Sequence, residues 1–262
     1  MRILVVADIH ANWPALAAID EPHDFAICLG DLVDYGPDPL ACVQWSMAHA
    51  RHAIRGNHDH GAAQGIQVKG EYGYRYLTRV TRPRVWEALG AEERRYLLQL
   101  PLTCRFTVDG RRFLLVHGTP RDPLDEYLMR DPETWAKRLR DSDADIVCVG
   151  HSHMQFNLRA GPTVVINPGS VGNPRDGDPR AAYAVIDGNK VELKRIEYPI
   201  EQTIARLDAS SLPSRAKEML RESYRMGRLA RPFRGPDPGE SADSGPEAEP
   251  EPEVEAEPDP GE

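Results

Sequence analysis

Ile3-Leu4-Val5-Val6-Ala7-Asp8-Ile9-His10, close to the N-terminus, is the stretch that decides the fold. Its five successive apolar residues predict a strand buried on both faces, the pattern of a parallel sheet. The next residues predict a helix, with Asn12 as its cap and Pro14 in its first turn. The alternation continues with a strand, a helix and a short strand at 25–29, 39–50 and 52–55. This order predicts parallel pairing and an α/β fold.

The pattern changes in the second half, where strand-like segments occur in adjacent pairs. Asp109-Gly110 separates the first pair, and this dipeptide is a strong hairpin signal. The paired segments cover residues 104–108 and 112–116, 156–159 and 163–166, and 182–186 and 190–196. Hairpins after a parallel start predict mixed sheets. We therefore expect a two-sheet mixed β sandwich flanked by helices, with a small helical, cap-like insertion at 64–101.

The net charge of −9 is unevenly distributed along the 262 residues. Of the 41 acids, eleven lie at 236–262 without any Lys or Arg, which leaves 30 acids against 32 bases elsewhere. The body is thus nearly neutral and lacks the basic footprint of a dedicated nucleic-acid-binding protein. We expect a domain at 1–200, a basic helical segment at 201–234 and a disordered Pro/Glu-rich tail at 235–262. The sequence does not identify a protein partner for the tail.

Nothing in the sequence indicates export or a membrane. The first strand begins at once, without the apolar core and cleavage site of a signal peptide. No apolar stretch approaches the about 20 residues that cross a bilayer. The four cysteines form no C-x-x-C pair, so we expect reduced, structural thiols at Cys28, Cys42, Cys104 and Cys148. A cytoplasmic protein is the prediction.

Five short polar clusters follow apolar segments, at residues 8–10, 30–34, 56–59, 117–118 and 150–153. The carboxyl edge of a parallel sheet is where ligand sites assemble. In an extended segment, residues i and i+2 project to the same side. Asp8 with His10, and His151 with His153, should therefore each present two ligands together. A single such pair would indicate ordinary turn residues. Five polar clusters that all follow apolar segments indicate a ligand-binding site.

Mixed carboxylate, imidazole and amide groups suit borderline divalent metals, with Mn as the first candidate and Fe, Zn, Ni or Co as alternatives. Seven ligands are too many for one such ion, but they fit two ions that share a bridging carboxylate. Asp31 is the natural bridge. Two divalent ions balanced by Asp8 and Asp31 favour an anionic substrate. Paired metals about 3.5–4 Å apart polarise a phosphate and generate hydroxide near neutral pH.

The sequence resembles the calcineurin-like metallophosphoesterases, especially their small bacterial and archaeal phosphoesterases. The family pattern D-x-H, G-D-x-x-D, G-N-H-[D/E], H, G-H-x-H occurs in order over residues 8–153. The resemblance implies one metal on Asp8, His10, Asp31 and His153, and a second on Asp31, Asn57, His117 and His151. It also implies that His58 protonates the leaving group while Asp34 orients it.

One position departs from the phosphoprotein phosphatase branch, where an arginine that binds phosphate follows G-D-x-V-D. Tyr35 stands there in this chain, which weakens a protein-phosphatase assignment. We predict dinuclear-metal hydrolysis of a small phosphate ester, a monoester or a diester, by metal-bound hydroxide. The alternatives are a serine/threonine protein phosphatase, a dinucleoside-polyphosphate hydrolase, or a non-catalytic scaffold of the same fold. No membrane partner is expected, and nucleic acid is not indicated as a partner, although it is a possible substrate.

Three residues are candidates for substrate binding. Arg121 closely follows His117, and its planar guanidinium could reach a phosphate; a solvated loop arginine is the alternative. Asn12 could contact phosphate or only cap its helix. Tyr35 takes the position from which the arginine of the related branch binds phosphate.

Overall fold

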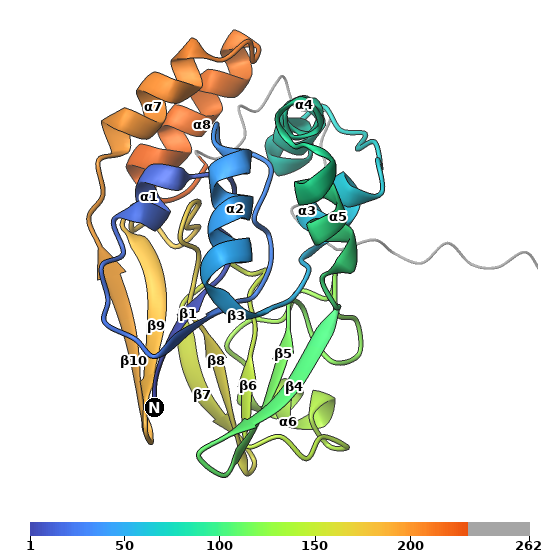
Figure 1. The fold of residues 1–262 in the computed structure, drawn as a ribbon, viewed down its shortest axis with the longest axis vertical. Helices are drawn as coiled ribbons and strands as arrows, with labels where there is room; N and C mark the ends of the chain where they lie inside the picture. Colours follow the sequence, from blue (N-terminus) through green and yellow to red (C-terminus); the bar gives the residue numbers. More distant parts are fainter. Residues whose placement is uncertain (230–262) are drawn as a thin grey trace, which may run out of the picture. The chain divides into compact units, whose positions relative to one another are not determined.

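The structure, a computed structural model, describes residues 1–229, which form two five-stranded sheets flanked by helices (Figure 1). The first sheet has the strand order β10–β9–β1–β2–β3, and the second has the order β4–β5–β6–β8–β7. The strands are β1 (Arg2–Val6), β2 (Phe25–Cys28), β3 (Ala50–Ala53), β4 (Thr103–Val108), β5 (Arg111–Val116), β6 (Ile146–Cys148), β7 (Phe156–Ala160), β8 (Thr163–Asn167), β9 (Ala181–Asp187) and β10 (Lys190–Ile196). The expected two-sheet mixed α/β sandwich is confirmed.

Helices cover the outer face of each sheet. They are α1 (Trp13–Ala17), α2 (Pro39–His49), α3 (Asn57–Ala63), α4 (Gly73–Ala88), α5 (Ala91–Gln99), α6 (Pro132–Arg138), α7 (Ile200–Ala209) and α8 (Ser214–Met226). Helix α6 packs on the second sheet, where Trp135 joins the apolar cluster formed by Leu114, Val147 and Phe156. In Figure 1, the other helices lie together at the opposite end of the molecule.

The N-terminal half forms the predicted parallel strands, with β1 paired to β2 and β2 to β3. Asn12 caps α1, because its side chain accepts a hydrogen bond from the Ala15 N–H at 3.3 Å. Strand β3 begins at Ala50, two residues before the expected start. The β9–β10 hairpin joins the same sheet by antiparallel pairing of β9 with β1, which makes the sheet mixed.

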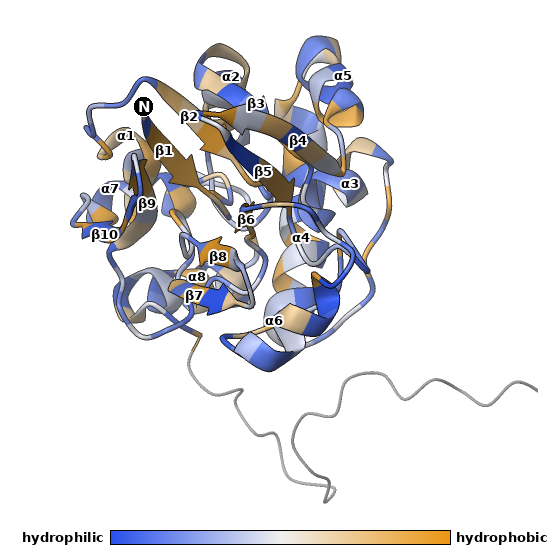
Figure 2. Ribbon diagram, turned by 90° about the horizontal axis from the view of Figure 1, so that it is seen from below, coloured by the Kyte–Doolittle hydropathy of each residue, from blue (hydrophilic) through white to orange (hydrophobic). Residues whose placement is uncertain are grey.

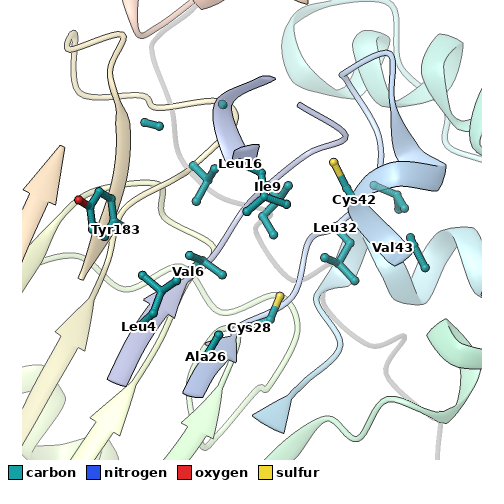
Figure 3. Close-up of a cluster of buried hydrophobic side chains, with 14 of the residues drawn as sticks. Leu4, Val6, Ile9, Leu16, Ala26, Cys28, Leu32, Cys42, Val43 and Tyr183 are labelled. Atoms are coloured by element: carbon teal, nitrogen blue, oxygen red, sulfur yellow. The ribbon is translucent and has the colours of Figure 1, made fainter. Parts of the chain in front are cut away.

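Strand β1 supplies side chains to two cores. Leu4 and Val6 face the helices and pack in one cluster with Leu16 and Val43 (Figure 3). Ile3 and Val5 belong to the cluster between the sheets, together with residues of the second sheet such as Phe113, Ile146 and Ile166. Burial on both faces explains why the strand is apolar without interruption. In Figure 2, β1 and β2 are accordingly hydrophobic, whereas α5 and α6 mix both kinds of residue.

Residues 64–101 contain helices α4 and α5, in the region where the sequence predicts an insertion. Helix α4 does not stand apart from the C-terminal helices. Its Tyr76 and Leu77 share a buried cluster with residues of α7 and α8 that include Ile204, Leu207, Leu220 and Tyr224. The helices after residue 200 therefore pack against the body of the protein.

Two of the four basic residues of α8 form surface ion pairs. Arg221 lies 2.6 Å from Asp208, and Arg225 lies 3.0 Å from Glu201. Exposed pairs of this kind contribute only about 0–1 kcal/mol each. The expected tail at 235–262 and the end of the basic segment lie outside the described residues. Among the helices of residues 1–229, none has the length and hydrophobicity needed to span a membrane.

Candidate metal centre

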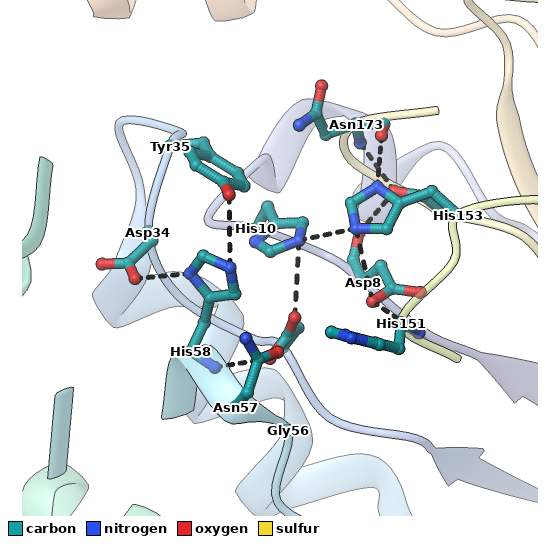
Figure 4. Close-up of polar contacts among 12 residues, drawn as sticks. Asp8, His10, Asp34, Tyr35, Gly56, Asn57, His58, His151, His153 and Asn173 are labelled. Carbon is teal, nitrogen blue, oxygen red and sulfur yellow. Dashed lines mark hydrogen bonds and ion pairs between the residues drawn. The ribbon is translucent and has the colours of Figure 1, made fainter. Parts of the chain in front are cut away.

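The polar clusters predicted from the sequence meet at one edge of the two sheets. Asp8 follows β1, Asp31 follows β2, and Asn57 begins α3 after β3. His117 follows β5 and His151 follows β6, which are parallel neighbours in the second sheet. Backbone hydrogen bonds join the loops: Asp8 N–H donates to Gly30 O at 3.0 Å, and Gly150 N–H donates to His117 O at 3.0 Å. Figure 4 shows several of these side chains converging.

The paired ligands do not lie on extended segments, so that part of the prediction is wrong. Asp8 and His10 have φ values of 53° and 46°, and His151 and His153 have values of 65° and 56°. Asp31 has a φ of 56°. Each left-handed non-glycine residue costs about 1–3 kcal/mol and persists only where surrounding contacts impose it. Sharp turns thus bring each pair of ligands together.

Two glycines allow the Asp31 loop to approach α3 closely. Gly30 has a φ of +89°, and a Cβ there would lie 2.3 Å from the backbone nitrogen of Gly56. A Cβ on Gly56 would lie 2.1 Å from Asp31 Oδ1. Neither position has room for a side chain, so both glycines are needed to place Asp31.

Backbone carbonyls fix the tautomers of three histidines. The Nδ1 atoms of His10, His117 and His153 lie 2.9, 2.8 and 2.5 Å from the carbonyl oxygens of Val33, Leu29 and Asn173. A carbonyl can only accept, so each Nδ1 carries a proton and each Nε2 faces the centre of the site. This is the arrangement in which protein histidines bind metals.

Several features of the site fit a cation. Burial lowers the pKa of His10 and His151 to about 3, and holds that of His153 well below its usual range. These rings are therefore neutral at pH 7, the form that binds metal. The unprotonated Nε2 atoms of His10 and His153 face each other at 3.1 Å (Figure 4), where two lone pairs cannot share a hydrogen bond. The buried Asp8 Oδ2 has no hydrogen-bond partner.

The ligand atoms form two groups that share Asp31. One contains Asp8, His10, Asp31 and His153, and the other contains Asp31, His117 and His151. Within each group the atoms lie within 4.8 Å of one another. Asn57 Oδ1 lies 3.2 Å from His117 Nε2, which places its amide with the second group. The structure therefore brings together all seven residues singled out from the sequence.

The electrostatics centre on Asp31. Burial alone would raise the pKa of Asp31, but neighbouring histidines, His117 first, hold it well below the usual value. The pKa of His117 is correspondingly raised to about 10, because the Asp31 carboxylate outweighs the effect of burial. A cation between these two side chains would displace a proton.

His58 is held by a buried chain of charges next to the ligands. Its Nδ1 donates to Asp34 Oδ2 at 2.7 Å, and its backbone N–H donates to Asp31 Oδ1 at 2.9 Å. The Nε of Arg82 donates to both oxygens of Asp34, at 3.0 and 2.9 Å. Burial would lower the pKa of His58, but the carboxylates of Asp31 and Asp34 raise it. Tyr35 lies alongside, with its hydroxyl 3.2 Å from His58 Nε2.

Comparison with known proteins places the chain in a family. The model of the calcineurin-like phosphoesterase superfamily domain matches residues 1–190. The chain belongs to the calcineurin-like phosphoesterases. The uncharacterized protein MJ0912 of Methanocaldococcus jannaschii is 31% identical over 253 residues, which cover 86% of this chain and 98% of the relative. A metallophosphoesterase structure from Sphaerobacter thermophilus, 31% identical, superposes with a TM-score of 0.73 and covers 87% of this chain and 99% of its own.

Phosphodiesterase YfcE of Escherichia coli is 24% identical over 201 residues, which cover 74% of this chain and 91% of YfcE. The family assignment and the ligand cluster together support two statements. The chain is a hydrolase that acts on phosphate esters, and it belongs to a family that uses divalent metals.

Two of the three predicted substrate contacts of this phosphoesterase do not line the pocket beside the candidate ligands. Arg121 is largely exposed and pairs with Glu126 at 2.8 Å. Asn12 is fully buried; its Oδ1 accepts from Ala15 and Thr203, and its Nδ2 donates to Gly172 O. Neither residue lines the pocket beside the ligands, whereas Tyr35 does. The structure thus corrects the expectation for Arg121 and Asn12.

Three other residues of the phosphoesterase were given no role in the sequence analysis. Arg82 comes from α4 and neutralises Asp34, and Arg175 lines the same pocket. The third, Asp59, is fully buried and accepts backbone N–H groups of Asp31, Leu32 and Gly56 at 2.7, 2.8 and 3.1 Å. Only Asp59 carried a sequence signal, as the last residue of the G-N-H-D motif.

Replacing Asp59 with alanine should destabilise the metal-free protein by at least about 3 kcal/mol. The change leaves three buried N–H groups without their acceptor, and each unsatisfied donor costs about 1–3 kcal/mol. Urea unfolding in EDTA measures the loss. The exposed Asp141→Ala variant is the control and should shift stability by less than about 0.5 kcal/mol. Equal stability of the Asp59 and Asp141 variants would contradict the prediction.

Proposed function

We propose that this phosphoesterase hydrolyses a small phosphate ester with two divalent cations. Asp8, His10, Asp31 and His153 would hold one, and Asp31, Asn57, His117 and His151 the other. The observation that carries the proposal is the shared carboxylate of Asp31, which belongs to both ligand groups. When bound, such a pair of cations polarises the ester and activates a water for attack. The mixed oxygen and nitrogen ligands favour Mn first, then Fe, Zn, Ni or Co.

The pocket beside these ligands supports a small substrate. It has a volume of about 400 Å³ and is lined by Asp31, Asn57, His58, His151 and His153. The loop before α4 and α4 itself also line it, with Ile66, Val68 and Tyr74 among their residues. Small-molecule sites have volumes of about 300–1,000 Å³ and mixed apolar and polar linings. A small ester suits this enclosure better than a folded phosphoprotein.

Within this pocket, His58 would donate a proton to the leaving oxygen. Asp34 holds Nδ1, which leaves Nε2 as the atom that can transfer a proton. The neighbouring carboxylates favour the protonated ring, and Arg82 keeps Asp34 ionised. This arrangement supports general-acid assistance by His58, with Asp34 as its positioning residue.

Removing the metals should abolish hydrolysis. After treatment with EDTA and desalting, we expect no turnover of 4-nitrophenyl phosphate or bis(4-nitrophenyl) phosphate, and recovery with Mn²⁺. Two ions per chain should bind, as measured by metal analysis. The melting temperature should rise with added metal, because an ion bound only by the folded state stabilises it. Undiminished activity in metal-free protein would overturn the proposal.

A substrate panel separates the alternatives. We expect small monoesters or diesters to be hydrolysed faster than phosphopeptides and dinucleoside polyphosphates. A preference for phosphopeptides would indicate a protein phosphatase, and turnover of none of these by metal-loaded protein would indicate a scaffold. The cytoplasmic location and the absence of a membrane partner stay predictions from the sequence.

A further inference from the structure

Arg175 lies in the loop between β8 and β9 and lines the pocket beside the metal-ligand residues His151 and His153. No motif of the phosphoesterase pattern includes it. Its position brings a permanent positive charge to the pocket, since a guanidinium is protonated at every physiological pH.

Two tyrosines from separate parts of the chain hold this guanidinium. The Cζ atom of Arg175 lies 3.9 Å from the ring centroid of Tyr74, a cation–π contact with the first turn of α4. Its Nη1 donates to the hydroxyl of Tyr127 at 3.0 Å. Tyr127 in turn donates to Ser152 O at 3.1 Å, and its ring packs edge-on against His151 with centroids 4.7 Å apart. Arg175 is thus positioned relative to the ligands by contacts on two sides.

Arg175 retains unused hydrogen-bonding capacity. Within residues 1–229, its one hydrogen bond is the bond to Tyr127, and its Nε is buried without a partner. Arg82, a buried arginine that also lines the pocket, differs because Asp34 neutralises it. Leaving a buried donor unsatisfied is costly, and such groups call for a specific explanation.

We infer that Arg175 binds the non-reacting oxygens of the substrate's phosphoryl group. The inference rests on the proposed function. A guanidinium presents a planar fork of donors that matches phosphate oxygens, and Arg175 lines the pocket that the candidate ligands Asp31, His151 and His153 also line. A monoester carries one more negative charge than a diester at neutral pH. Arg175 therefore contributes more to binding a monoester.

The test compares wild type with Arg175→Gln and Arg180→Gln, all loaded with Mn²⁺. Arg180 is the matched control: it lies in the same loop, is exposed and pairs with Asp178 at 2.6 Å. The paired substrates are 4-nitrophenyl phosphate and bis(4-nitrophenyl) phosphate, which share one leaving group. Inorganic phosphate serves as a competitive inhibitor, so that phosphate binding is measured apart from turnover.

For Arg175→Gln we expect kcat/KM on the monoester to fall about 10- to 100-fold, the range for losing a charge-assisted hydrogen bond. The inhibition constant for inorganic phosphate should rise by a similar factor, and the loss on the diester should be several-fold smaller. Metal content and melting temperature should match wild type. Arg180→Gln should leave all these values unchanged, and Arg175→Lys should recover part of the loss through its charge.

Three results would overturn the inference. They are an unchanged inhibition constant for phosphate, equal losses on the monoester and the diester, or a loss of metal in Arg175→Gln. The last result would show that Arg175 acts only by supporting Tyr127 against His151. If wild type itself hydrolyses neither ester with any of the candidate metals, the proposed function is wrong. That outcome differs from the three results above, which concern only the role of Arg175.

Discussion

The Asp31→Asn variant should lose both metals and all measurable hydrolysis. Asp31 Oδ2 lies 3.3 Å from His117 Nε2 and 3.7 Å from His10 Nε2, so one carboxylate serves both ligand groups. An amide of the same shape has one oxygen and no charge. Its NH₂ would face a site built for cations, and the two cations would repel each other more strongly. The loss should exceed the about 10–100-fold reduction caused by removing an outer-shell partner of a metal ligand.

Asp8→Asn is the matched comparison, because Asp8 belongs to only one group. We expect this variant to lose one metal preferentially and to retain more metal than Asp31→Asn. Metal analysis of both purified proteins, with kcat on 4-nitrophenyl phosphate, measures the difference. Circular dichroism checks that each variant is folded. If Asp31→Asn holds two ions as tightly as wild type does, Asp31 is not the bridge.

The gathering of the candidate ligands could be predicted from the sequence because most of them follow a buried strand. From Ile3 onward β1 contains only apolar residues, as does β6, so the first Asp or His after each apolar run marks the sheet edge. Parallel strands of one sheet end at the same edge, and the packing of the two sheets then brings Asp8 and His151 together, with the His151 N–H donating to Asp8 Oδ1 at 3.2 Å. Both the fold class and the gathering of the ligands follow from this rule.

The local geometry of the ligands could not be predicted in the same way. The left-handed conformations of His10 and His153 are imposed by tertiary contacts, such as the hydrogen bond from His153 Nδ1 to Asn173 O. Non-glycine residues rarely adopt such conformations, although histidine does so more often than most. The sequence pattern therefore indicates which residues are candidate ligands but not how the backbone presents them.

The sequence pattern also could not predict which charged residues surround the candidate ligands. Arg121 lies only four residues after His117, yet its side chain turns to Glu126. Arg82 and Arg175 come from a helix and a loop remote from any motif, and only the fold brings them to the pocket. Closeness in sequence is a poor guide to closeness in space on loops, because neighbouring carboxylates compete for each arginine.

Replacing His58 with alanine should slow hydrolysis of esters with poor leaving groups about 10²–10⁴-fold, the usual contribution of a general acid. Alkoxide leaving groups need a proton as the bond to phosphorus breaks, whereas 4-nitrophenolate leaves without one. The loss should therefore be large for an alkyl phosphate and small for 4-nitrophenyl phosphate. A series of esters with graded leaving-group pKa measures this, and the variant's plot of log kcat against pKa should be steeper than that of wild type.

This dependence on the leaving group distinguishes proton donation from a structural role of His58. The His58 backbone N–H to Asp31 survives in the alanine variant, so metal content should match wild type. His49, an exposed histidine at the end of α2, provides the control: His49→Ala should preserve both rate and slope. Asp34→Asn should show the same steepening to a smaller degree, because the ring of His58 stays in place but loses its charged partner. If His58→Ala loses metal and slows all esters equally, His58 supports the metal centre and another group protonates the leaving oxygen.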